Sequence, residues 1–454
     1  MHFSQADKGG AIVLADPVVV NEVILSELQN PSKYVRLNSD PRHEIESNLL
    51  ELCKSHLPNK GLTQNELFLI TGHTDNGGKT HNPLFSAGKP NPFPLFKLHS
   101  MSAEDLANKV TPPYRLVTSM KFGPTKRPAL FLDSVLTPVS VSYCGSEYLK
   151  DTPHFLNKLA DYETQLCAPG VSLVTLDVKA LYPSIDPNML PFAVEAALDT
   201  VSDFSAERKK FIVDLVKFSI NNGVTHYRGD WYLSILGIPT GASDSVCLAN
   251  IYMRWVLIKF FATFPHFKEL FVCYSRFIDD LFGGWAGSVR QFYTFIYVFN
   301  GFGKRYGIIF DKEQIGDTVH NLDVSVSNAT GELVTDLYTK PTDAHRYLHR
   351  NSFHPQHTFR GIPFSQMRRA VIICSTPYLR DIAIGNIIKY LLECNYKLEH
   401  LEEAKSRALQ LDRKKLLDSH RTPPTSDDSQ PLCFVLPFSP DVSKIRRLVF
   451  SLLG

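Results

Sequence analysis

The amino-acid sequence predicts an α+β fold whose centre is an antiparallel sheet of the split βαβ kind. Residues 171–178 (VSLVTLDV) form a compact apolar run that is typical of a buried strand. Residues 243–260 carry apolar side chains at helical spacing, which predicts a helix with one buried face. Two further apolar runs, 271–278 and 281–285, flank Asp279-Asp280 and predict a β-hairpin. The order strand, helix, strand, strand is that of a split βαβ unit.

Shorter elements are expected on both sides of this unit. A strand is predicted at Ala11–Leu14, a helix is predicted to begin at Asp186-Pro187, and a hairpin is predicted to join 325–327 to 332–338. In the helix at 243–260 the expected buried stripe consists of Val246, Ala249, Met253, Val256, Leu257 and Phe260. Residues 377–418 are expected to be helical, whereas 71–94 and 419–431 are predicted to be a loop and a linker, the latter followed by a strand at 432–436.

Composition excludes several classes of protein. The chain has 454 residues, of which 44% are hydrophobic and 21% charged, as in ordinary globular proteins. The 48 Lys and Arg nearly balance the 46 Asp and Glu, so contacts with nucleic acid must come from local patches. The 8 cysteines form no CxxC pair, which argues against a disulfide framework or a zinc ribbon and favours a reducing compartment. The sequence shows neither a signal-peptide pattern nor a run of 18 apolar residues, so we expect no membrane partner.

Two basic patches interrupt this balanced background. Residues 115–132 carry four basic side chains and no acid, and residues 340–370 carry six Lys or Arg and one acid, Asp343. The basic residues are Arg115, Lys121, Lys126 and Arg127 in the first patch, and Lys340, Arg346, Arg350, Arg360, Arg368 and Arg369 in the second. Each patch fits either a solvated face or a surface that contacts nucleic-acid phosphates.

Three acidic residues carry the strongest chemical signal. Asp279 and Asp280 are adjacent carboxylates between two apolar strands, where their repulsion costs free energy unless cations neutralise it. Asp177 ends another apolar strand, and if the strands are neighbours the carboxylates can hold two Mg²⁺ ions. Two such ions can activate a primer 3′-hydroxyl and stabilise a leaving pyrophosphate, as in nucleotidyl transfer. The alternative is a polar turn without a catalytic role.

Ordered motifs extend this hypothesis to a family. The blocks LDVKALYPSID (176–186), GIPTGASDSVCLANIY (237–252) and RFIDDLF (276–282) occur in the order and approximate spacing of the palm blocks of reverse transcriptases. Further matching segments are ADKGGAIVL (6–14), PLFKLHS (94–100), RLVTSMKFGPTK (115–126), LDVSVSNATGELVTDLYTKPTD (322–343), YLHRNSFHPQH (347–357) and IPFSQMRRAVIICS (362–375). With these, the chain resembles the reverse transcriptases of Penelope-like retroelements. The resemblance implies a right-hand polymerase fold with fingers, a palm that contains the split βαβ antiparallel sheet, and a helical thumb.

The resemblance also implies a domain order. It places an N-terminal extension at 1–93, fingers at 94–170, the palm with the catalytic core at 171–340, a thumb at 341–420, and a linker and tail at 421–454. Many members of the family carry a C-terminal GIY-YIG nuclease, for which no pattern is found here. The expectation is therefore either a truncated copy or a retrotransposon enzyme that extends existing 3′ ends. Phe277 departs from the family pattern, because many relatives have Tyr there.

Individual roles follow from the same resemblance. Asp177 and Asp279 would be the metal ligands, with Asp280 beside them and the backbone carbonyl of Val178 as a further ligand. Tyr182 would lie under the sugar of the incoming nucleotide and exclude a ribose 2′-hydroxyl. The remaining nucleotide contacts would be Lys97 and Arg115 with the phosphates, Gly237, Pro239 and Gly241 in a turn against the base pair, and Lys312 as a proton donor to pyrophosphate. The two basic patches would supply the nucleic-acid contacts.

The sequence therefore predicts an RNA-directed DNA polymerase that adds dNTPs to a DNA primer on an RNA template. The cofactors would be two Mg²⁺ ions, with Mn²⁺ as a substitute, and the product would be a bound RNA–DNA duplex. Two alternatives stay open: a domesticated nucleic-acid-binding protein with this fold but no catalysis, and an RNA-directed RNA polymerase. Nuclear localisation is expected from the biology of such elements, because the basic runs 413–415 and 444–447 are weak signals.

Lys8 and a cluster of histidines have no assigned role. Lys8 matches a family position whose function the residues do not reveal. The sequence also does not give the oligomeric state. Four histidines, His345, His349, His354 and His357, cluster within 13 residues. Their spacing fits either a zinc site or packing and phosphate contacts in the expected thumb, and the second interpretation is favoured because no cysteine or carboxylate completes a zinc site.

Overall fold

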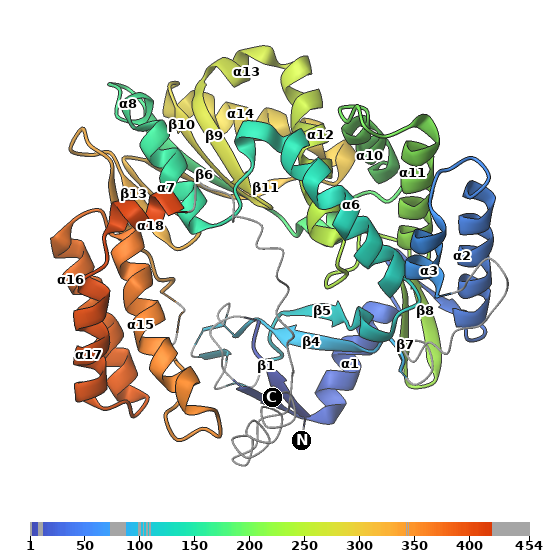
Figure 1. Ribbon diagram of the computed structural model, residues 1–454, viewed down its shortest axis with the longest axis horizontal. Helices are drawn as coiled ribbons and strands as arrows, with labels where there is room; N and C mark the ends of the chain where they lie inside the picture. Colours follow the sequence, from blue (N-terminus) through green and yellow to red (C-terminus); the bar gives the residue numbers. More distant parts are fainter. Residues whose placement is uncertain are drawn as a thin grey trace, which may run out of the picture.

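A computed structural model describes residues 2–7, 12–72, 88–98, 101–102, 104–105, 108, 110–341, 343 and 345–419. These residues form a ring of three parts in Figure 1. A four-stranded sheet and its helices lie at the top, C-terminal helices lie on the left, and N-terminal elements lie below and to the right. Lys8, the expected strand at 432–436 and the basic run 444–447 lie outside the described residues, as does the predicted linker beyond residue 419.

The centre of the fold is a four-stranded antiparallel sheet. Its strand order is β11 (Phe310–Gly316), β6 (Ser172–Val178), β10 (Asp280–Trp285) and β9 (Phe271–Phe277), which confirms the predicted split βαβ arrangement. Side chains alternate across β6, so that Leu176 joins the largest hydrophobic core and Leu173 joins a separate cluster on the other face. In β10, Leu281 and Phe282 divide between the same two clusters. The sheet thus has one face for the main core and a second face that packs on a smaller hydrophobic cluster.

Helices cover the core face of this sheet. The main ones are α12 (Ser245–Thr263) and α14 (Val289–Gly303). Around them lie α6 (Lys126–Cys144), α9 (Leu181–Ser184), α10 (Leu190–Leu198), α11 (Ala206–Asn221) and α13 (Pro265–Glu269), with 3-10 turns η2 (Met120–Phe122), η3 (Gly145–Glu147) and η4 (Lys304–Tyr306). By length and composition α12 could cross a membrane, but 67% of it is buried inside the protein. Its apolar character is therefore explained by packing between the sheet and the surrounding helices.

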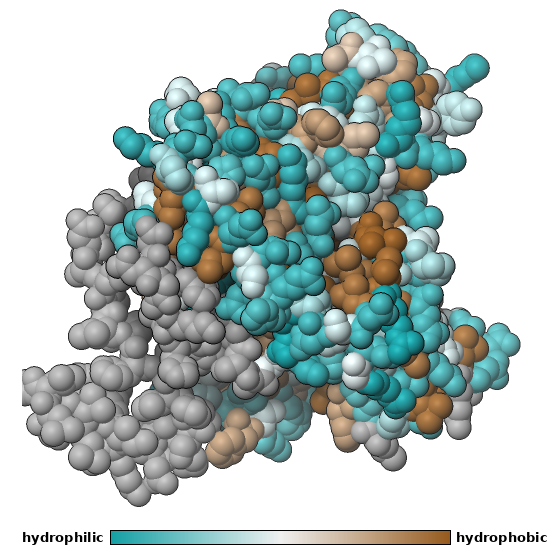
Figure 2. Space-filling view, turned by 90° about the vertical axis from the view of Figure 1, so that its right-hand side faces the viewer, coloured by the Kyte–Doolittle hydropathy of each residue, from teal (hydrophilic) through white to brown (hydrophobic). Residues whose placement is uncertain are grey.

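The N-terminal part consists of small sheets packed on helices. The strands are β1 (His2–Gln5) paired with β2 (Ile12–Ala15), β4 (Pro92–Phe96) paired with β5 (Tyr114–Thr118), and a three-stranded sheet in the order β3 (Tyr34–Leu37), β8 (Asp230–Ser234), β7 (Val224–Tyr227). The helices are α1 (Pro17–Leu28), α2 (Arg42–His56) and α3 (Gln64–Thr71). The pairing of β3 with β8 joins the start of the chain to a strand near residue 230. The outer face of this part is mostly hydrophilic, with a few apolar patches (Figure 2).

The C-terminal part combines a small sheet with a helical bundle. The sheet has the order β12 (Thr318–Asn321), β13 (Val324–Ser327), β14 (Val334–Leu337), which contains the predicted hairpin. The helices are α15 (Gln356–Ile373), α16 (Pro377–Glu393), α17 (Leu398–Leu409) and α18 (Arg413–Ser419), and α7 (Thr152–Asp161) and α8 (Glu163–Leu166) lie beside the sheet. Thr335 Oγ1 donates to the carbonyl of Ile373 at 2.6 Å, and Arg369 Nε donates to Asp323 at 2.6 Å. These bonds join the bundle to the small sheet.

Three local predictions are wrong. The helix expected at Asp186 begins at Leu190, because the Asp186 carboxylate instead accepts the amide of Asn188 in a turn that precedes the helix. Val246 was expected in the buried stripe of α12 but is 45% exposed, although its neighbours Ser245 and Cys247 in the same turn are buried. Residues 92–94 were expected in a loop and belong to β4, where proline is tolerated because among the described strands β4 pairs with β5 alone.

The aromatic part of the main core is centred on Phe260 of α12. Its ring centroid lies between 5.0 and 6.0 Å from those of Phe261, Phe264, Phe267, Phe295, Phe299 and Phe302. Rings at these separations contribute packing and quadrupole interactions beyond their burial. Helices α12, α13 and α14 therefore meet around one side chain.

We expect Phe260→Ala to lower the free energy of unfolding by about 3–5 kcal/mol, because it leaves a cavity at the meeting point of three helices. Urea denaturation followed by circular dichroism measures the change. The matched control is Tyr297→Ala, at an aromatic residue of α14 that is 80% exposed, for which we expect a change within about 0.5 kcal/mol. Equal losses in the two variants would contradict the prediction.

Candidate active site

The strand register places two acids directly opposite each other. Asp280 pairs with Asp177 across β10 and β6, so their side chains are immediate cross-strand neighbours. By the alternation of the pleat, both side chains lie on the face that carries Leu173 and Phe282, away from the main core. The strand that ends near Asp177 is thus a neighbour of the hairpin that carries Asp279 and Asp280, which is the arrangement that a carboxylate site requires.

A lysine lies on the other side of Asp177. Lys312 of β11 pairs with Asp177 in the sheet, and its Nζ atom is 3.7 Å from Asp177 Oδ2. The Lys312 side chain is 77% exposed, so its ammonium is a solvated neighbour and does not fill the space above the acids. Exposed ion pairs at such distances contribute little to stability.

Asp279 lies in a loop, whereas the adjacent Asp280 begins strand β10. This two-residue loop lies between the paired residues Phe277 and Asp280. Burial raises the pKa of the Tyr182 hydroxyl, the Asp279 carboxylate adds to the rise, and the Arg115 guanidinium opposes it. Tyr182 of α9 therefore lies within electrostatic range of Asp279 in the β9–β10 loop and of Arg115 in β5.

A glycine turn fixes the backbone around Tyr182. The amide of Ile238 donates to the carbonyl of Tyr182 at 2.9 Å. Gly237 has φ +70°, and a Cβ atom there would lie 2.5 Å from Pro183 Cα, so no other residue fits without displacing that backbone. Ser245 Oγ donates to the carbonyl of Pro239 at 2.7 Å and ties the turn to the start of α12. Gly241 also has a positive φ, +103°. The predicted turn residues thus form one unit with Tyr182.

The N-terminal segment reaches the same region. Asp7 Oδ1 lies 3.7 Å from Arg115 Nε, and the Asp7 side chain is almost completely buried. The amide of Asp7 donates to the carbonyl of Phe96 at 2.9 Å, which fixes the segment along β4. Lys97 directly follows Phe96. Its backbone amide donates to the carbonyl of Pro113 at 2.7 Å, and its side chain is half-buried. Both predicted phosphate contacts therefore belong to the β4–β5 hairpin.

The other basic residues of the first patch have different surroundings. Lys126 Nζ donates to Ser243 Oγ at 3.1 Å, next to the glycine turn. Arg127 Nη1 donates to the carbonyls at the end of α3, of Phe68 at 3.1 Å and Leu69 at 3.3 Å, and burial lowers its pKa. Lys121 is exposed, with Nζ 5.3 Å from the ring centroid of Phe122. Arg127 thus closes a helix end, whereas Lys121 presents its charge to solvent.

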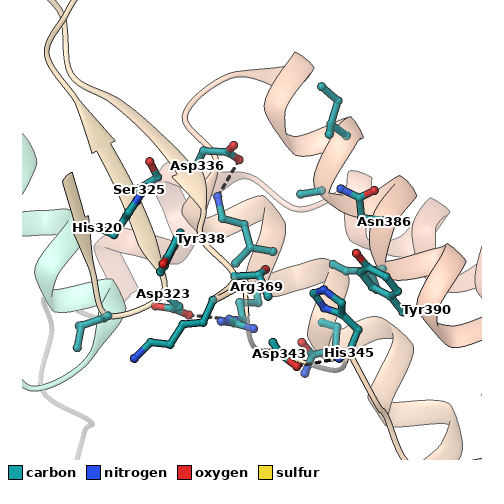
Figure 3. A pocket seen from close by; sticks show the side chains of 18 of the residues that line it. His320, Asp323, Ser325, Asp336, Tyr338, Asp343, His345, Arg369, Asn386 and Tyr390 are labelled. Carbon is teal, nitrogen blue, oxygen red and sulfur yellow. Dashed lines mark hydrogen bonds and ion pairs between the residues drawn. The ribbon is translucent and has the colours of Figure 1, made fainter. Parts of the chain in front are cut away.

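Two adjoining cavities lead away from the acids. The first, of about 270 Å³, is lined by Asp177, Asp280 and Lys312. The second, of about 840 Å³, lies between the small sheet and helices α15 and α16 (Figure 3). The residues that line both are His320, Leu322, Tyr338 and Lys340. We call the two cavities together the sheet–bundle groove. It runs from the carboxylates to the helical bundle.

Stacked aromatic pairs line the sheet–bundle groove. The rings of His320 and Tyr338 are parallel with centroids 3.9 Å apart, and those of His345 and Tyr390 are parallel at 3.8 Å. Figure 3 shows the second pair on the bundle side and Arg369 between the two sides. Arg369 donates to Asp323, which also accepts from Thr152 Oγ1 at 2.5 Å. Asp323 is therefore the residue that joins the small sheet to both α7 and α15.

The predicted basic residues near this groove divide into two groups. Lys340, Arg346 and Arg369 line its larger cavity. Arg350 donates to Gln356 at 2.7 Å and lies over the ring of Phe359, so it braces the start of α15. Arg360 is exposed and Arg368 is half-buried on the same helix. The first group is placed to meet a ligand in the groove, and Arg350 has a partner within the bundle.

The histidine cluster does not converge on a point. His345 stacks on Tyr390, and His354 lies edge-on to Phe359 with centroids 6.2 Å apart. His349 Nδ1 accepts the amide of Asn351 at 3.3 Å. Among the residues that the structure describes, no three His, Cys, Asp or Glu side chains are grouped closely enough to hold an ion by themselves. Any ion at the acids would therefore need further oxygen ligands, such as phosphate or water, as Mg²⁺ sites commonly have.

Several residues of the site were missed in the sequence. His320, Asp323 and Tyr338 line the groove but were given no role. Asp323 and Tyr338 lie in the matching segment 322–343, and the alternation of Tyr338 with Lys340 at the end of a predicted strand was the available signal. Arg276 is buried next to the Asp279 loop. Its signal was a basic residue inside the apolar strand YSRFI, where a charge needs an internal partner.

Comparison with known proteins agrees with this geometry. A family model described as the animal helix-turn-helix domain matches residues 346–406, which span α15, α16 and most of α17. No curated protein matches the chain. The structure of telomerase from Candida albicans in complex with a TWJ fragment of telomeric RNA is similar with a TM-score of 0.54 and 12% identity, over 89% of this chain and 68% of that one.

Two further structures are similar. Apo telomerase from Candida tropicalis matches with a TM-score of 0.50 and 10% identity, over 91% of this chain and 68% of that one. The RNA-dependent RNA polymerase of a human picobirnavirus matches with a TM-score of 0.46 and 11% identity, over 82% and 73%. The chain has the right-hand polymerase fold. In this fold the palm is the antiparallel split βαβ sheet, which here is the four-stranded sheet with its acids.

A buried acid supports the palm behind the glycine turn. Asp244 directly precedes α12 and is almost completely buried, with Ser219 Oγ 3.5 Å from its Oδ2 atom. Burial raises the pKa of Asp244 from 3.8 to about 6. The folded state therefore holds a proton there that the unfolded chain releases near pH 4. The resulting stability is fully present below pH 3.8 and is lost as the pH rises through about 6.

We expect Asp244→Asn to remove this loss. At 1.36 kcal/mol per pKa unit, the variant should gain about 2 kcal/mol relative to wild type between pH 4 and pH 7.5. Urea denaturation at both pH values measures it, with Asp199→Asn, at an exposed aspartate, as the control. A difference between variant and wild type that is the same at both pH values would show that Asp244 does not titrate in this range.

Proposed function

We propose that this chain is an RNA-directed DNA polymerase of a Penelope-like retroelement. The observation that carries the proposal is the pairing of Asp177 with Asp280 across β6 and β10, with Asp279 in the adjoining loop beside Tyr182. Carboxylates at these places, within a right-hand polymerase fold, are suited to nucleotidyl transfer. The ordered sequence blocks that hold these residues support the more specific assignment to reverse transcriptases.

The reaction adds one deoxynucleotide to a primer. The primer 3′-oxygen attacks the α-phosphorus of the dNTP and loses its proton, the new P–O bond forms, and the bond to the β-phosphate breaks, which releases pyrophosphate. Two Mg²⁺ or Mn²⁺ ions held by Asp177, Asp279 and the carbonyl of Val178, with Asp280 beside them, would supply charge stabilisation. The donor set fits such hard cations, because it consists of oxygen atoms alone. Arg115 and Lys97 would hold the phosphates, and Lys312 would protonate the leaving pyrophosphate.

The sheet–bundle groove is suited to the growing strand. It begins at Asp177 and Asp280 and extends along the thumb, so a strand that ends at the acids would continue through it. Lys340 and Arg346 offer charges for phosphates, and the stacked rings of its walls offer flat surfaces for sugars or bases. These contacts read the shape and charge of an RNA–DNA duplex, and they leave its sequence unread. The expected nuclear location is part of this proposal.

Tyr182 is the residue that would select deoxyribose. Its backbone is fixed by Ile238 and by the close approach of Gly237, so the ring cannot retreat easily from a nucleotide beside Asp279. A ring held in this way would clash with a ribose 2′-hydroxyl. An RNA-directed RNA polymerase would instead need a small or polar side chain at this place.

The primary test is Asp279→Asn, which removes one negative charge with little change of shape. We expect primer extension on an RNA template with Mg²⁺ and dNTPs to fall by a factor on the order of 10³ or more. The variant would lose a ligand of the metal ions that stabilise the negative charge of the transition state. Asp199→Asn, an exposed aspartate away from the site, should keep wild-type activity. Full activity in Asp279→Asn would refute the assignment. Tight duplex binding without extension by the wild-type protein would instead favour a binding protein.

The second test addresses the sugar. We expect Tyr182→Ala to raise the use of rNTPs relative to dNTPs by on the order of 10- to 100-fold, since steric differences of this size are worth roughly 1–3 kcal/mol. The ratio of kcat/KM for the two substrates measures the effect. Tyr182→Phe keeps the ring and should keep the discrimination. Unchanged selectivity in Tyr182→Ala would show that another side chain reads the sugar.

A further inference from the structure

Arg276 is a buried cation directly behind the loop that carries Asp279. It belongs to β9, three residues before Asp279, and its side chain is 1% exposed. A guanidinium is costly to remove from water unless its N–H groups find acceptors and its charge is compensated. The acceptors that the structure shows around Arg276 are neutral, and Asp279 is the carboxylate whose field acts on it.

The hydrogen bonds of Arg276 join three elements. Its Nη1 atom donates to the carbonyl of Ile278 at 2.6 Å and to Asn250 Oδ1 at 3.0 Å. Its Nη2 atom donates to the carbonyl of Asn250 at 3.1 Å and to Cys144 Sγ at 3.4 Å. Asn250 lies in α12, and Cys144 ends α6. The rigid guanidinium fork thus connects the β9–β10 loop to two core helices.

The loop needs such a partner because of its conformation. Ile278 has φ +55°, a left-handed conformation that a β-branched residue rarely adopts. It is the first residue of a two-residue loop, a position where a positive φ usually calls for glycine. The bond from Arg276 holds the carbonyl of Ile278, and that carbonyl belongs to the peptide group that leads into Asp279. Holding this peptide fixes the direction in which Asp279 leaves the loop.

Charge gives Arg276 a second effect on the same loop. Asp279 and Asp280 are adjacent carboxylates, and Asp280 also faces Asp177, so the loop carries repulsion. Arg276 is buried behind the loop, and the attraction between its guanidinium and the Asp279 carboxylate offsets part of this repulsion while leaving the solvent side open to a metal ion. Lys312 approaches from the solvent side and does not replace this contribution.

We propose that Arg276 is a positioning residue of the palm, which sets the Asp279 carboxylate for divalent cations through the carbonyl of Ile278. The proposal rests on the proposed function, because it concerns the same metal-binding acids. It adds a residue that would touch neither the ions nor the nucleotide and would act through the loop.

The test compares buried Arg276 with half-buried Arg254. Arg276→Lys keeps the charge but cannot span Ile278 and both acceptors of Asn250, so we expect Mn²⁺ to bind the free protein at least 10-fold more weakly, as measured by electron paramagnetic resonance. The rate of primer extension should fall by a similar factor, with KM for the primer–template unchanged. Arg254→Lys is the matched control. Arg254 lies in α12, one turn after Asn250, and it donates to Glu147 and not to the β9–β10 loop. It should lose stability and keep Mn²⁺ affinity.

Each outcome decides the proposal. Wild-type Mn²⁺ affinity in Arg276→Lys would overturn it, and so would equal weakening in Arg254→Lys, which would indicate a general structural effect. If Arg276→Lys does not fold, Asn250→Ala removes one acceptor and should weaken Mn²⁺ binding in the same direction, and an unchanged affinity would again overturn the proposal. If the wild-type protein binds Mn²⁺ but does not extend primers, the proposed function fails while the role of Arg276 in metal binding is still decided by the variants.

Discussion

The pairing of β6 with β10 is the constraint on which the rest of the site depends. A slip of one residue would turn Asp280 into the main core and bring Leu281 to the face of Asp177, because side chains alternate along a strand. The apolar residues prevent that slip. Leu176 and Leu281 pack on α12 and α14, and their burial holds the register that places the acids on the opposite face. The core of the palm thus positions polar residues that it does not contain.

The acids at the β9–β10 loop face two different environments. Asp177 and Asp280 line the sheet–bundle groove, whereas Asp279 acts electrostatically on Tyr182 of α9, as does Arg115 of β5. Contacts between distant elements hold both environments in place. The turn at Gly237 fixes α9 to the start of α12, and Asp323 fixes the small sheet to α15 through Arg369. A polymerase needs this kind of placement, because charge and position provide most of its catalysis.

Much of the palm was predictable because its signals are local. The compact apolar strand at 171–178, the hairpin around Asp279-Asp280 and the helix at 243–260 all appear where the runs and the periodicity of apolar residues place them. Predictions about the burial or the contacts of single side chains were less accurate. Val246 fits the helical stripe but lies outside the core, and Arg127 belongs to a basic patch but closes the end of α3. Charge in a sequence does not reveal which carbonyl a side chain will meet.

The sequence by itself determined which residue types stand at the ends of the palm strands, because strand periodicity and acidic residues are local properties of the chain. It could not determine that Asp177 and Asp280 face each other, since that register is set by packing across residues far apart in the sequence. The stacked walls of the groove, the bond from Arg276 to the loop and the contact of Asp7 with Arg115 were also decided by the tertiary structure. Each of these contacts joins residues that lie in different elements of the chain, and they meet only when the chain folds.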